Sequence, residues 1–384
     1  MSEQAPGRDG GREDGQGGDD DGSTEGGRPD ALYADLTDLD VEADLLAARE
    51  LLFDLVAISS PTGEERPAAT RLASFFAERD REVYIDDVGN VRAPADDGAL
   101  LTSHVDTVPG DIPVRVEDGV LHGRGSVDAK GPLAAMAAAA YATGASFVGV
   151  VGEETDSRGA RHLIEDRAAP GAVLNGEPSG WDGVTLGYRG FLAGTYVATS
   201  ESGHTSRPEP NAIQDAIAWW SSVEDAFAGD EWEPVFEQVT AKPVGFDGGY
   251  EPDGLSVEAT VDAQLRIPPD LTAAEVREVA DGRLDNGTVH WEEPIPPVMT
   301  DPRSDVATAL RGAIRRTDGE PRLLRKTGTS DMNLFAREWD CPMATYGPGD
   351  SDLDHAPDER LELAEFDRAV AVLERATDSL LNDA

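Results

Sequence analysis

Histidine and carboxylate residues recur at points of the chain where a short apolar stretch ends or a helix begins. The members of this set are His104, Asp106, Asp128, Glu153, Glu154, Glu177 and His355. Imidazole and carboxylate groups are ligands that zinc, cobalt and similar divalent ions accept. A carboxylate shared by two such ions can hold them about 3.5–4 Å apart, where they polarise a carbonyl group and activate a water molecule. A free glutamate beside them could take the proton of that water and deliver it to a leaving amine.

The elements that must position these residues alternate between strands and helices. Strands are predicted at 100–103, 146–151, 172–174 and 343–346, and helices at 41–58, 66–79, 130–143, 159–166, 305–317 and 364–381. Three of the strands run into His104, Glu153 and Glu177. Because this alternation is typical of an α/β sheet, whose ligands bind at the carboxyl ends of strands, we expect these residues to converge in one cleft.

A different pattern occupies the middle of the chain. It comprises a strand, a helix, two strands, a helix and a strand, predicted at 192–199, 211–226, 235–244, 254–267, 273–282 and 288–292. This order indicates an α+β sandwich of ferredoxin-like type. The predicted organisation is an inserted α+β domain at 187–297, an α/β domain at 30–186 and 298–384, and a disordered, acidic, glycine-rich tail at 1–29.

The balance of charge is strongly negative. The 384 residues include 76 acidic and 32 basic ones, a formal net charge of −44. Residues 1–30 hold nine acidic and three basic residues and contribute only −6, so the acidic residues belong mainly to the rest of the chain. Such a surface disfavours nucleic acids and anionic membranes. Molar salt would screen its self-repulsion, so we expect a halophilic protein.

Cysteine usage and hydropathy indicate a cytoplasmic protein. Cys341 is the only cysteine, which excludes an intrachain disulfide, and we expect it to be a small buried residue. The N-terminus shows no apolar signal-peptide region, and no apolar run approaches the ~20 residues of a membrane span.

The ordered set His104-x-Asp106, Asp128, Glu153-Glu154, Glu177 and His355 resembles that of the M20-type peptidases, a family of dinuclear metallo-aminoacylases and carboxypeptidases. The resemblance spans about residues 41–380. It implies a catalytic α/β domain interrupted by a lid and dimerisation domain, and two divalent ions per subunit, Zn²⁺ or Co²⁺.

The same resemblance implies a role for each residue. Asp128 would bridge the two ions, with His104 and Glu177 completing one site and Glu154 and His355 completing the other. Asp106 would accept a hydrogen bond from His104 and fix its orientation. Glu153 would be the general base.

Further residues resemble the substrate-binding parts of the family. His204 and Asn211 lie in a segment similar to the lid motif whose histidine stabilises the oxyanion, and which can reach the partner subunit in a homodimer. Arg266 resembles the arginine that grips a substrate carboxylate. Gly328, Thr329 and Ser330 resemble a substrate-contacting loop. The alternatives are an ordinary polar loop for these segments and a surface arginine for Arg266.

Within the family, residues 326–333, 346–351 and 354–355 resemble the branch that hydrolyses [LysW]-lysine and [LysW]-ornithine. That branch releases lysine or ornithine from the γ-glutamyl terminus of a small acidic amino-group carrier protein. Acetylornithine deacetylase, succinyl-diaminopimelate desuccinylase and other aminoacylases or dipeptidases are alternatives. An inactive metal-binding interaction protein is a further alternative, which the intact Glu153 argues against.

One basic segment stands out in this acidic chain. Residues 311–326 contain six basic and two acidic residues, a local charge of +4. We interpret the segment as a docking surface for an acidic carrier or an anionic substrate. The alternative is that its arginines pair with neighbouring acidic side chains.

Overall fold

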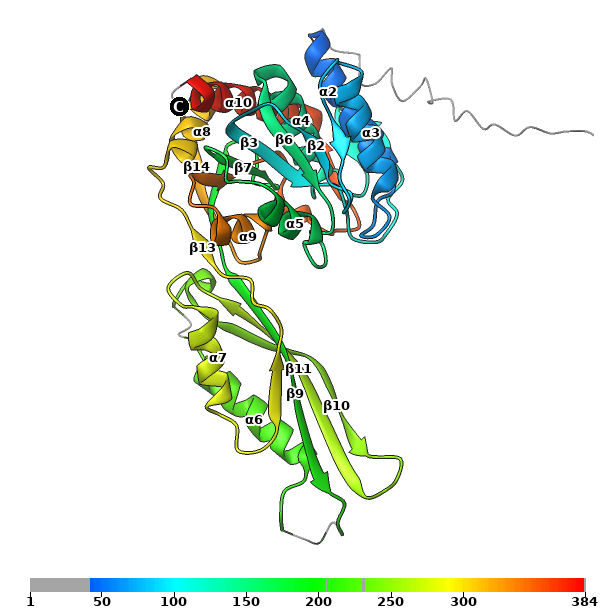
Figure 1. Cartoon of the computed structure of the whole chain (residues 1–384), viewed down its shortest axis with the longest axis vertical. Helices are drawn as coiled ribbons and strands as arrows, with labels where there is room; N and C mark the ends of the chain where they lie inside the picture. The colour runs from blue at the N-terminus through cyan, green and yellow to red at the C-terminus, as the bar shows by residue number, and fades with distance from the viewer. Residues whose placement is uncertain (1–41, 205, 207, 230–231, 383–384) are drawn as a thin grey trace, which may run out of the picture.

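The protein is described from a computed structural model, which covers residues 42–204, 206, 208–229 and 232–382 (Figure 1). The predicted tail at 1–29 lies outside the described residues, as do Thr205 and Arg207 of the lid motif. Figure 1 shows two lobes, a broad one built on a large sheet and a narrow one that extends away from it. The mixture of helices and strands confirms the expected α/β class.

A nine-stranded mixed sheet forms the centre of the broad lobe. Its order is β1 (Tyr84–Ile85), β2 (Val91–Ala93), β6 (Ala145–Val150), β3 (Asp96–His104), β7 (Val173–Gly176), β15 (Met343–Thr345), β8 (Gly183–Tyr188) and β13 (Val298–Met299), with β14 (Arg322–Lys326) paired to β8 off this path. Strands β6, β3, β7 and β15 are parallel. The carboxyl ends of these strands therefore meet at one edge.

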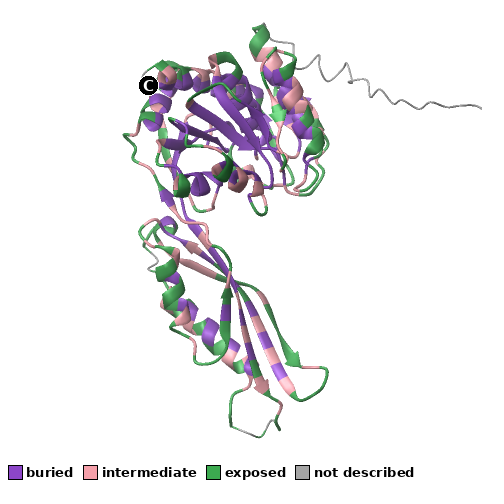
Figure 2. Ribbon diagram, in the orientation of Figure 1, coloured by how far each residue is buried: buried purple, intermediate pink, exposed green. Residues whose placement is uncertain are grey.

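Helices cover both faces of this sheet. They are α2 (Ala43–Ala57), α3 (Arg66–Ala77), α4 (Lys130–Thr143), α8 (Asp305–Arg316) and α10 (Leu363–Asn382) on one face, and α5 (Arg158–Asp166) and α9 (Asp331–Glu338) on the other. The central strands are buried on both faces because adjacent side chains enter different cores: Leu101 packs with the first group and Leu100 with the second. Figure 2 shows this buried sheet in purple.

Helix α4 lies deepest in the first layer. Its residues from Lys130 to Ala140 are all buried, and most of them are alanines that allow α2 and α10 to pack closely. Gly144 ends the helix in the left-handed conformation, with φ of 76°, and its N–H donates to the carbonyl of Ala140. Because α4 packs against α2 and α10, its N-terminus is fixed at the edge of the sheet where the parallel strands end.

A second, small sheet joins two loops of that edge. It consists of β4 (Arg115–Glu117), β5 (Val120–His122) and β16 (Arg360–Glu362), with β5 in the middle. Strand β5 precedes the loop to Asp128, and β16 follows the short helix η2 (Ser351–Leu353) and His355. Pairing of β5 with β16 therefore places these two loops side by side.

The narrow lobe is a four-stranded antiparallel sheet with two helices on one face. Its strands are ordered β10 (Thr240–Tyr250), β11 (Ser256–Ile267), β9 (Gly190–Glu201) and β12 (Thr288–Trp291), with α6 (Ala212–Ala226) and α7 (Ala273–Asp281) packed against them. This is the order expected of a ferredoxin-like fold. Buried residues alternate with more exposed ones along β11, whereas β10 is exposed along most of its length (Figure 2).

One predicted strand of this lobe is partly wrong. The segment 235–244 was expected to be extended throughout, but it begins with a 3-10 helix, η1 (Val235–Glu237), and β10 starts only at Thr240. The turn buries Phe236, whose ring lies 4.9 Å from the guanidinium of Arg325. This contact between the lobes favours the turn over a longer strand.

Candidate metal centre

Two groups of candidate ligands share the carboxylate of Asp128. Oδ1 of Asp128 lies 3.1 Å from Nε2 of His104, and its Oδ2 lies 3.1 Å from Nε2 of His355. The first group is completed by Glu177, whose Oε2 is 3.9 Å from Nε2 of His104. The second is completed by Glu154, whose Oε2 is 3.1 Å from Nε2 of His355. In each group the ligand atoms lie within 4.8 Å of one another.

The parallel strands bring these residues together. His104 is the last residue of β3, Glu154 lies in the turn after β6, and Glu177 follows β7 directly. Asp128 lies just before α4. His355 reaches the same point from the loop after η2 and adopts a positive φ of 60°, which is uncommon for a residue with a side chain.

Asp106 acts differently from its expected role. Nδ1 of His104 lies 2.9 Å from the backbone oxygen of Asp106, whereas its distance to Oδ1 is 3.7 Å. The carboxylate instead accepts N–H bonds from Gly152, Glu153 and Glu154, at 2.9, 3.1 and 3.2 Å. The Asp106 backbone therefore orients one ligand, and its side chain holds the turn that carries Glu153 and Glu154.

The electrostatics of the cluster fit divalent cations. Burial, aided by the charge of Asp128, raises the pKa of Glu177 to about 8. Hydrogen bonds to Asp128 and Glu154 raise the pKa of His355 to about 10. The cluster thus has a high affinity for positive charge. Glu154 Oε1 is buried with no hydrogen-bond partner in the described part of the chain, and two imidazoles with three carboxylates are a suitable donor set for zinc or cobalt.

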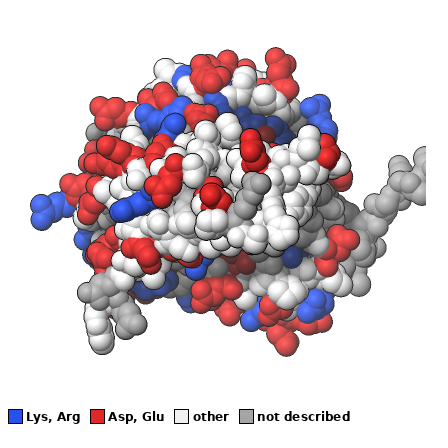
Figure 3. Space-filling model, turned by 90° about the horizontal axis from the view of Figure 1, so that it is seen from below, with Lys and Arg blue, Asp and Glu red and all other residues white. Residues whose placement is uncertain are grey.

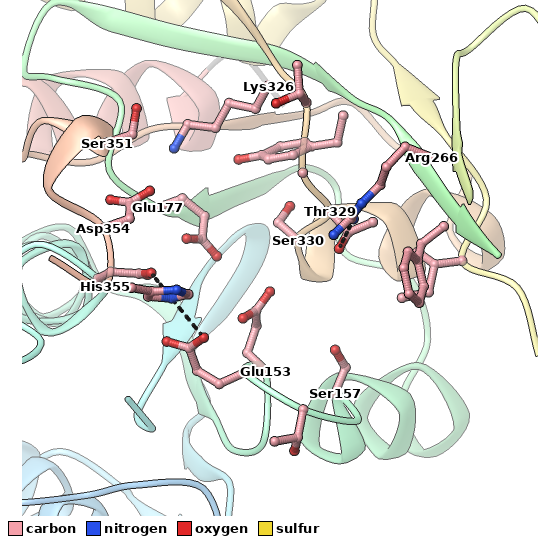
Figure 4. Close-up of a pocket in the computed structure, with 18 of the residues that line it drawn as sticks. Glu153, Ser157, Glu177, Arg266, Lys326, Thr329, Ser330, Ser351, Asp354 and His355 are labelled. Atoms are coloured by element: carbon pink, nitrogen blue, oxygen red, sulfur yellow. Dashed lines mark hydrogen bonds and ion pairs between the residues drawn. The ribbon is translucent and has the colours of Figure 1, made fainter. Parts of the chain in front are cut away.

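Glu153 lies beside the cluster but belongs to neither ligand group. Burial and the nearby charge of Glu177 raise its pKa well above the usual range. Figure 4 shows its carboxylate directed into the cavity. A buried carboxylate with high proton affinity is suited to accept and return a proton.

The cavity in front of the cluster has a volume of about 680 Å³. Arg266, Gly328, Thr329 and Ser330, which the family resemblance would assign to substrate contact, line this cavity. Nη1 of Arg266 lies 3.4 Å from Oγ1 of Thr329 (Figure 4). The guanidinium lies over the ring of Phe191, 4.6 Å from its centroid. The guanidinium is thus held in place with donors directed toward the cavity.

The structure does not bring His204 and Asn211 to this cavity. They line a separate cavity of about 450 Å³ in the narrow lobe, together with Ser200, Glu201 and Tyr250. Asn211 is the N-cap of α6, and its Oδ1 accepts the N–H of Gln214 at 3.0 Å. A single chain therefore places these two residues outside its own metal centre.

Sequence reasoning gave several residues of the site no role in it. Tyr188 lines the cavity, as do Lys326 and Asp354 from segments that resemble the branch, and Glu359 is fully buried behind it. Glu359 lies four residues after His355 in a run of polar residues, where no sequence pattern marks it as buried.

Cys341, expected to be a small buried residue, is half-buried. Its side chain packs at the margin of the core beneath α5 and α9. Burial, with the nearby charge of Asp340, raises the pKa of its thiol to about 11.

The basic segment 311–326 is partly paired with acidic neighbours. Arg322 forms an ion pair of 2.6 Å with Asp182, and Arg325 forms one of 3.0 Å with Glu237. Arg315 and Arg316 lie exposed at the end of α8. Local pairing thus accounts for two of the six basic residues.

Fold and site together define a class of protein, the hydrolases with a dinuclear metal centre. Two ligand groups bridged by one carboxylate, with a free glutamate beside them, are the arrangement that such catalysis requires.

The chain belongs to peptidase family M20/M25/M40, whose profile matches residues 100–379. It is 41% identical over 365 residues to a [LysW]-lysine hydrolase of Deinococcus radiodurans, covering 88% of this chain and 98% of that one. It is 29% identical to a [LysW]-lysine/[LysW]-ornithine hydrolase of Sulfurisphaera tokodaii, covering 89% and 98% of the two chains. Family membership confirms the expected class of enzyme, a hydrolase of amide bonds.

Solved structures share the fold. The M20 metallo-carboxypeptidase Sso-CP2 of Sulfolobus solfataricus matches with a TM-score of 0.71 at 17% identity, over 89% of this chain and 100% of that one. The YXEP protein of Bacillus subtilis, a dinuclear metal-binding peptidase, matches with a TM-score of 0.64 at 15% identity, over 88% and 98%. Among the described residues, no helix combines the length and apolarity needed to span a bilayer.

Proposed function

We propose that this protein is a metal-dependent amidohydrolase that releases lysine or ornithine from the γ-glutamyl terminus of an amino-group carrier protein, in lysine or arginine biosynthesis. The observation that carries the proposal is a complete pair of ligand groups with a free glutamate, in a chain 41% identical to nearly the whole of a [LysW]-lysine hydrolase. Activity on carrier-linked substrate tests it.

The ligand groups supply the chemistry of the reacting centre. His104, Asp128, Glu154, Glu177 and His355 would hold two divalent ions, Zn²⁺ or Co²⁺. When bound, these ions polarise the amide carbonyl and lower the pKa of a water molecule. Glu153 takes the proton of this water as it attacks the carbonyl, and then donates the proton to the departing amine.

The opposite wall of the cavity orients the substrate. The product amino acid carries an α-carboxylate next to the amine that is released. The guanidinium of Arg266 is half-buried, braced by Phe191 and close to Thr329, which makes it a suitable fork for that carboxylate. Binding there directs the amide toward Glu153 and the metal ligands.

A homodimer would supply the missing part of the site. His204 and Asn211 lie in the narrow lobe and away from the metal centre of their own chain, so we infer that they serve the centre of the partner subunit. The edge strand β10 exposes Val244, Phe246 and Tyr250. Figure 3, which views the molecule from the narrow lobe, shows acidic side chains around the periphery and few charges at the centre. Such a surface suits contact with another subunit.

We expect the enzyme to act in a salt-rich cytoplasm. The net charge of −44 is unfavourable for a compact chain in dilute buffer, and salt screens its repulsion.

The first experiment is a panel of substrates assayed at molar salt with Zn²⁺ or Co²⁺. It contains carrier-linked lysine, carrier-linked ornithine, acetylornithine and succinyl-diaminopimelate. We expect hydrolysis of the carrier-linked substrates at kcat/KM values at least tenfold above those of the other two. A clear preference for acetylornithine or succinyl-diaminopimelate would contradict the proposed substrate.

The Glu153→Gln variant tests the proposed base. Gln cannot accept the proton of the water, so kcat should fall by about 10²–10⁴-fold. Because Glu153 belongs to neither ligand group, the metal content per subunit should be unchanged. The control is Glu154→Gln, which should lose metal. Full activity of Glu153→Gln would remove Glu153 from the mechanism.

A further inference from the structure

Strand β14 forms an open edge of the large sheet. It pairs with β8 on one side only, and β8 is the one element with which it makes extensive contact among the described residues. Arg322 and Leu323 are exposed, as is Arg325. Figure 1 shows β14 at the side of the broad lobe, between α8 and the junction with the narrow lobe. An exposed edge is a template on which another extended chain can pair.

The hydrogen bonds of β14 show which backbone groups face outward. The N–H of Arg322 donates to the carbonyl of Asp182 at 2.8 Å, and the carbonyl of Lys326 accepts the N–H of Arg189 at 3.4 Å, so both residues face β8. Because this orientation alternates along a strand, Leu323 and Arg325 present their N–H and C=O groups to the open side. No backbone partner for these groups exists within the described ranges.

The edge leads into the catalytic cavity. Arg325 and Lys326 line this cavity, and so does the loop from Thr327 to Ser330 that continues the strand. At its other end, β14 follows the exposed basic end of α8, which carries Arg315 and Arg316. A peptide paired to β14 would therefore lie with one end in the cavity and the other beside α8.

The local charge around β14 determines which kind of peptide would bind to this edge. Residues 311–326 carry a charge of +4 in a chain whose net charge is −44. When the ion-pair partners Asp182 and Glu237 are counted with them, the local charge is +2. Most of the remaining surface repels acidic peptides, so this edge is a favoured place for one to bind.

We propose that β14 binds the segment of the acidic protein substrate that leads to its scissile terminus, in an extended conformation, as an additional strand. This inference rests on the proposed function, because it concerns how that substrate reaches the same cavity. The scissile end must lie at Lys326, so a segment that carries the scissile bond at its carboxyl end runs parallel to β14. Its five residues would span about 16 Å, from the end of α8 to the cavity mouth. Backbone pairing supplies affinity, and the basic side chains select carboxylates.

The test compares Leu323→Pro with Leu323→Ala. Proline removes the outward N–H of Leu323 and is compatible with an edge strand, whereas alanine retains the N–H. Each variant is assayed with carrier-linked lysine and with a short substrate, lysine joined through its α-amino group to the γ-carboxyl of N-acetylglutamate. We expect Leu323→Pro to lower kcat/KM about tenfold for the carrier-linked substrate and less than about twofold for the short one. Leu323→Ala should match the wild type on both.

Charge is tested with Arg316→Glu and its control Arg277→Glu, an exposed helical arginine in the narrow lobe. Arg316→Glu should lower kcat/KM for the carrier-linked substrate at low salt, and molar salt should reduce this loss. Arg277→Glu should have no effect. The Leu323→Pro loss should persist in molar salt, because hydrogen bonds are not screened.

A binding measurement separates this proposal from the proposed function. A fluorescein-labelled hexapeptide of alternating Glu and Asp should bind the metal-loaded wild type more tightly than Leu323→Pro, by fluorescence anisotropy. If the wild type hydrolyses neither substrate but shows this difference, the proposed function fails and the docking edge stands. Equal activities of Leu323→Pro and Leu323→Ala on carrier-linked lysine would overturn the proposal. So would a shift of Leu323→Pro to a smaller assembly in sedimentation with carrier activity unchanged, since β14 would then join two copies of this chain.

Discussion

At the scale of single residues, the metal centre depends on a carboxylate that does not face it. Glu359 is fully buried and accepts the N–H groups of Gly125, Val127 and Asp128, at 3.0, 2.8 and 3.0 Å. It also accepts a 2.8 Å bond from Nη1 of Arg124. Both of its oxygens are thus occupied by donors. Because Glu359 follows His355 in the chain, it ties the loop of one ligand to the loop of the bridging ligand.

The Glu359→Gln variant should weaken metal binding. In either orientation, the amide nitrogen of Gln would face two donors that the carboxylate oxygen had accepted, so the Asp128 loop would shift. We expect metal affinity to fall by about 10–100-fold, the range typical of groups that orient ligands. Calorimetric titration of the metal-free protein with Co²⁺ measures this. The control is Glu362→Gln on the exposed face of β16. Unchanged Co²⁺ affinity in Glu359→Gln would contradict this role.

At the scale of elements, the sequence predicted the helices and strands that have strong hydrophobic periodicity or a continuous apolar run. The helix at 130–143 was expected with the bounds that α4 has, and the strands ending near His104 and Glu177 were also expected. It did not predict β4, β5 and β16, because each has only three residues, too few for a periodic pattern. The pairing of β5 with β16 joins segments more than 200 residues apart, from Leu121 to Leu361, which no local pattern can indicate. Strands β4 and β5 form a local hairpin through Asp118 and Gly119, a turn signal that the sequence prediction did not use.

The candidate site was predictable for a related reason. The ligands lie where parallel strands end, so their positions follow from strand order and from chemistry. The sequence placed Asp106 beside His104, but which of its oxygens lies nearest the ring depends on the turn at Gly152, which no local pattern indicates. Glu359 has no periodic or apolar signal, and only the fold shows that it is buried.

Helix α6 allows a structural role of Asn211 to be separated from a catalytic one. Its Oδ1 caps the helix by accepting the N–H of Gln214, which leaves the amide N–H₂ to serve a substrate oxygen. Asn211→Ala should lose about 1 kcal/mol of unfolding free energy and also activity. Asn211→Asp keeps the capping oxygen but lacks the amide donor, so its stability should be retained while kcat falls at least about tenfold. Urea unfolding and steady-state kinetics measure the two effects. Full activity of Asn211→Asp would show that Asn211 is only a cap.

At the scale of the whole molecule, the charge of −44 predicts that salt stabilises the fold. The Debye length falls from about 10 Å at 0.1 M to about 3 Å at 1 M salt, so repulsion between carboxylates is largely screened at the higher concentration. We expect the Tm of the metal-loaded protein to rise by about 5 °C or more over this range of KCl. Sucrose of equal osmolality is the control for non-ionic stabilisation. A Tm independent of KCl would contradict a salt-adapted surface.

The division into two lobes predicts that two inactive variants can restore activity to each other. Glu153 belongs to the metal centre of its own chain, whereas His204 lies in the narrow lobe and is inferred to serve the partner. In a hybrid dimer of Glu153→Gln and His204→Ala, one of the two centres combines an intact Glu153 with an intact His204. After random exchange of equal amounts, half of the dimers are hybrids, so activity should recover to about a quarter of the wild-type value. Separate assays of the two variants provide the baseline. If the mixture exchanges subunits, as followed by a mass tag, but gains no activity, His204 does not act across the dimer.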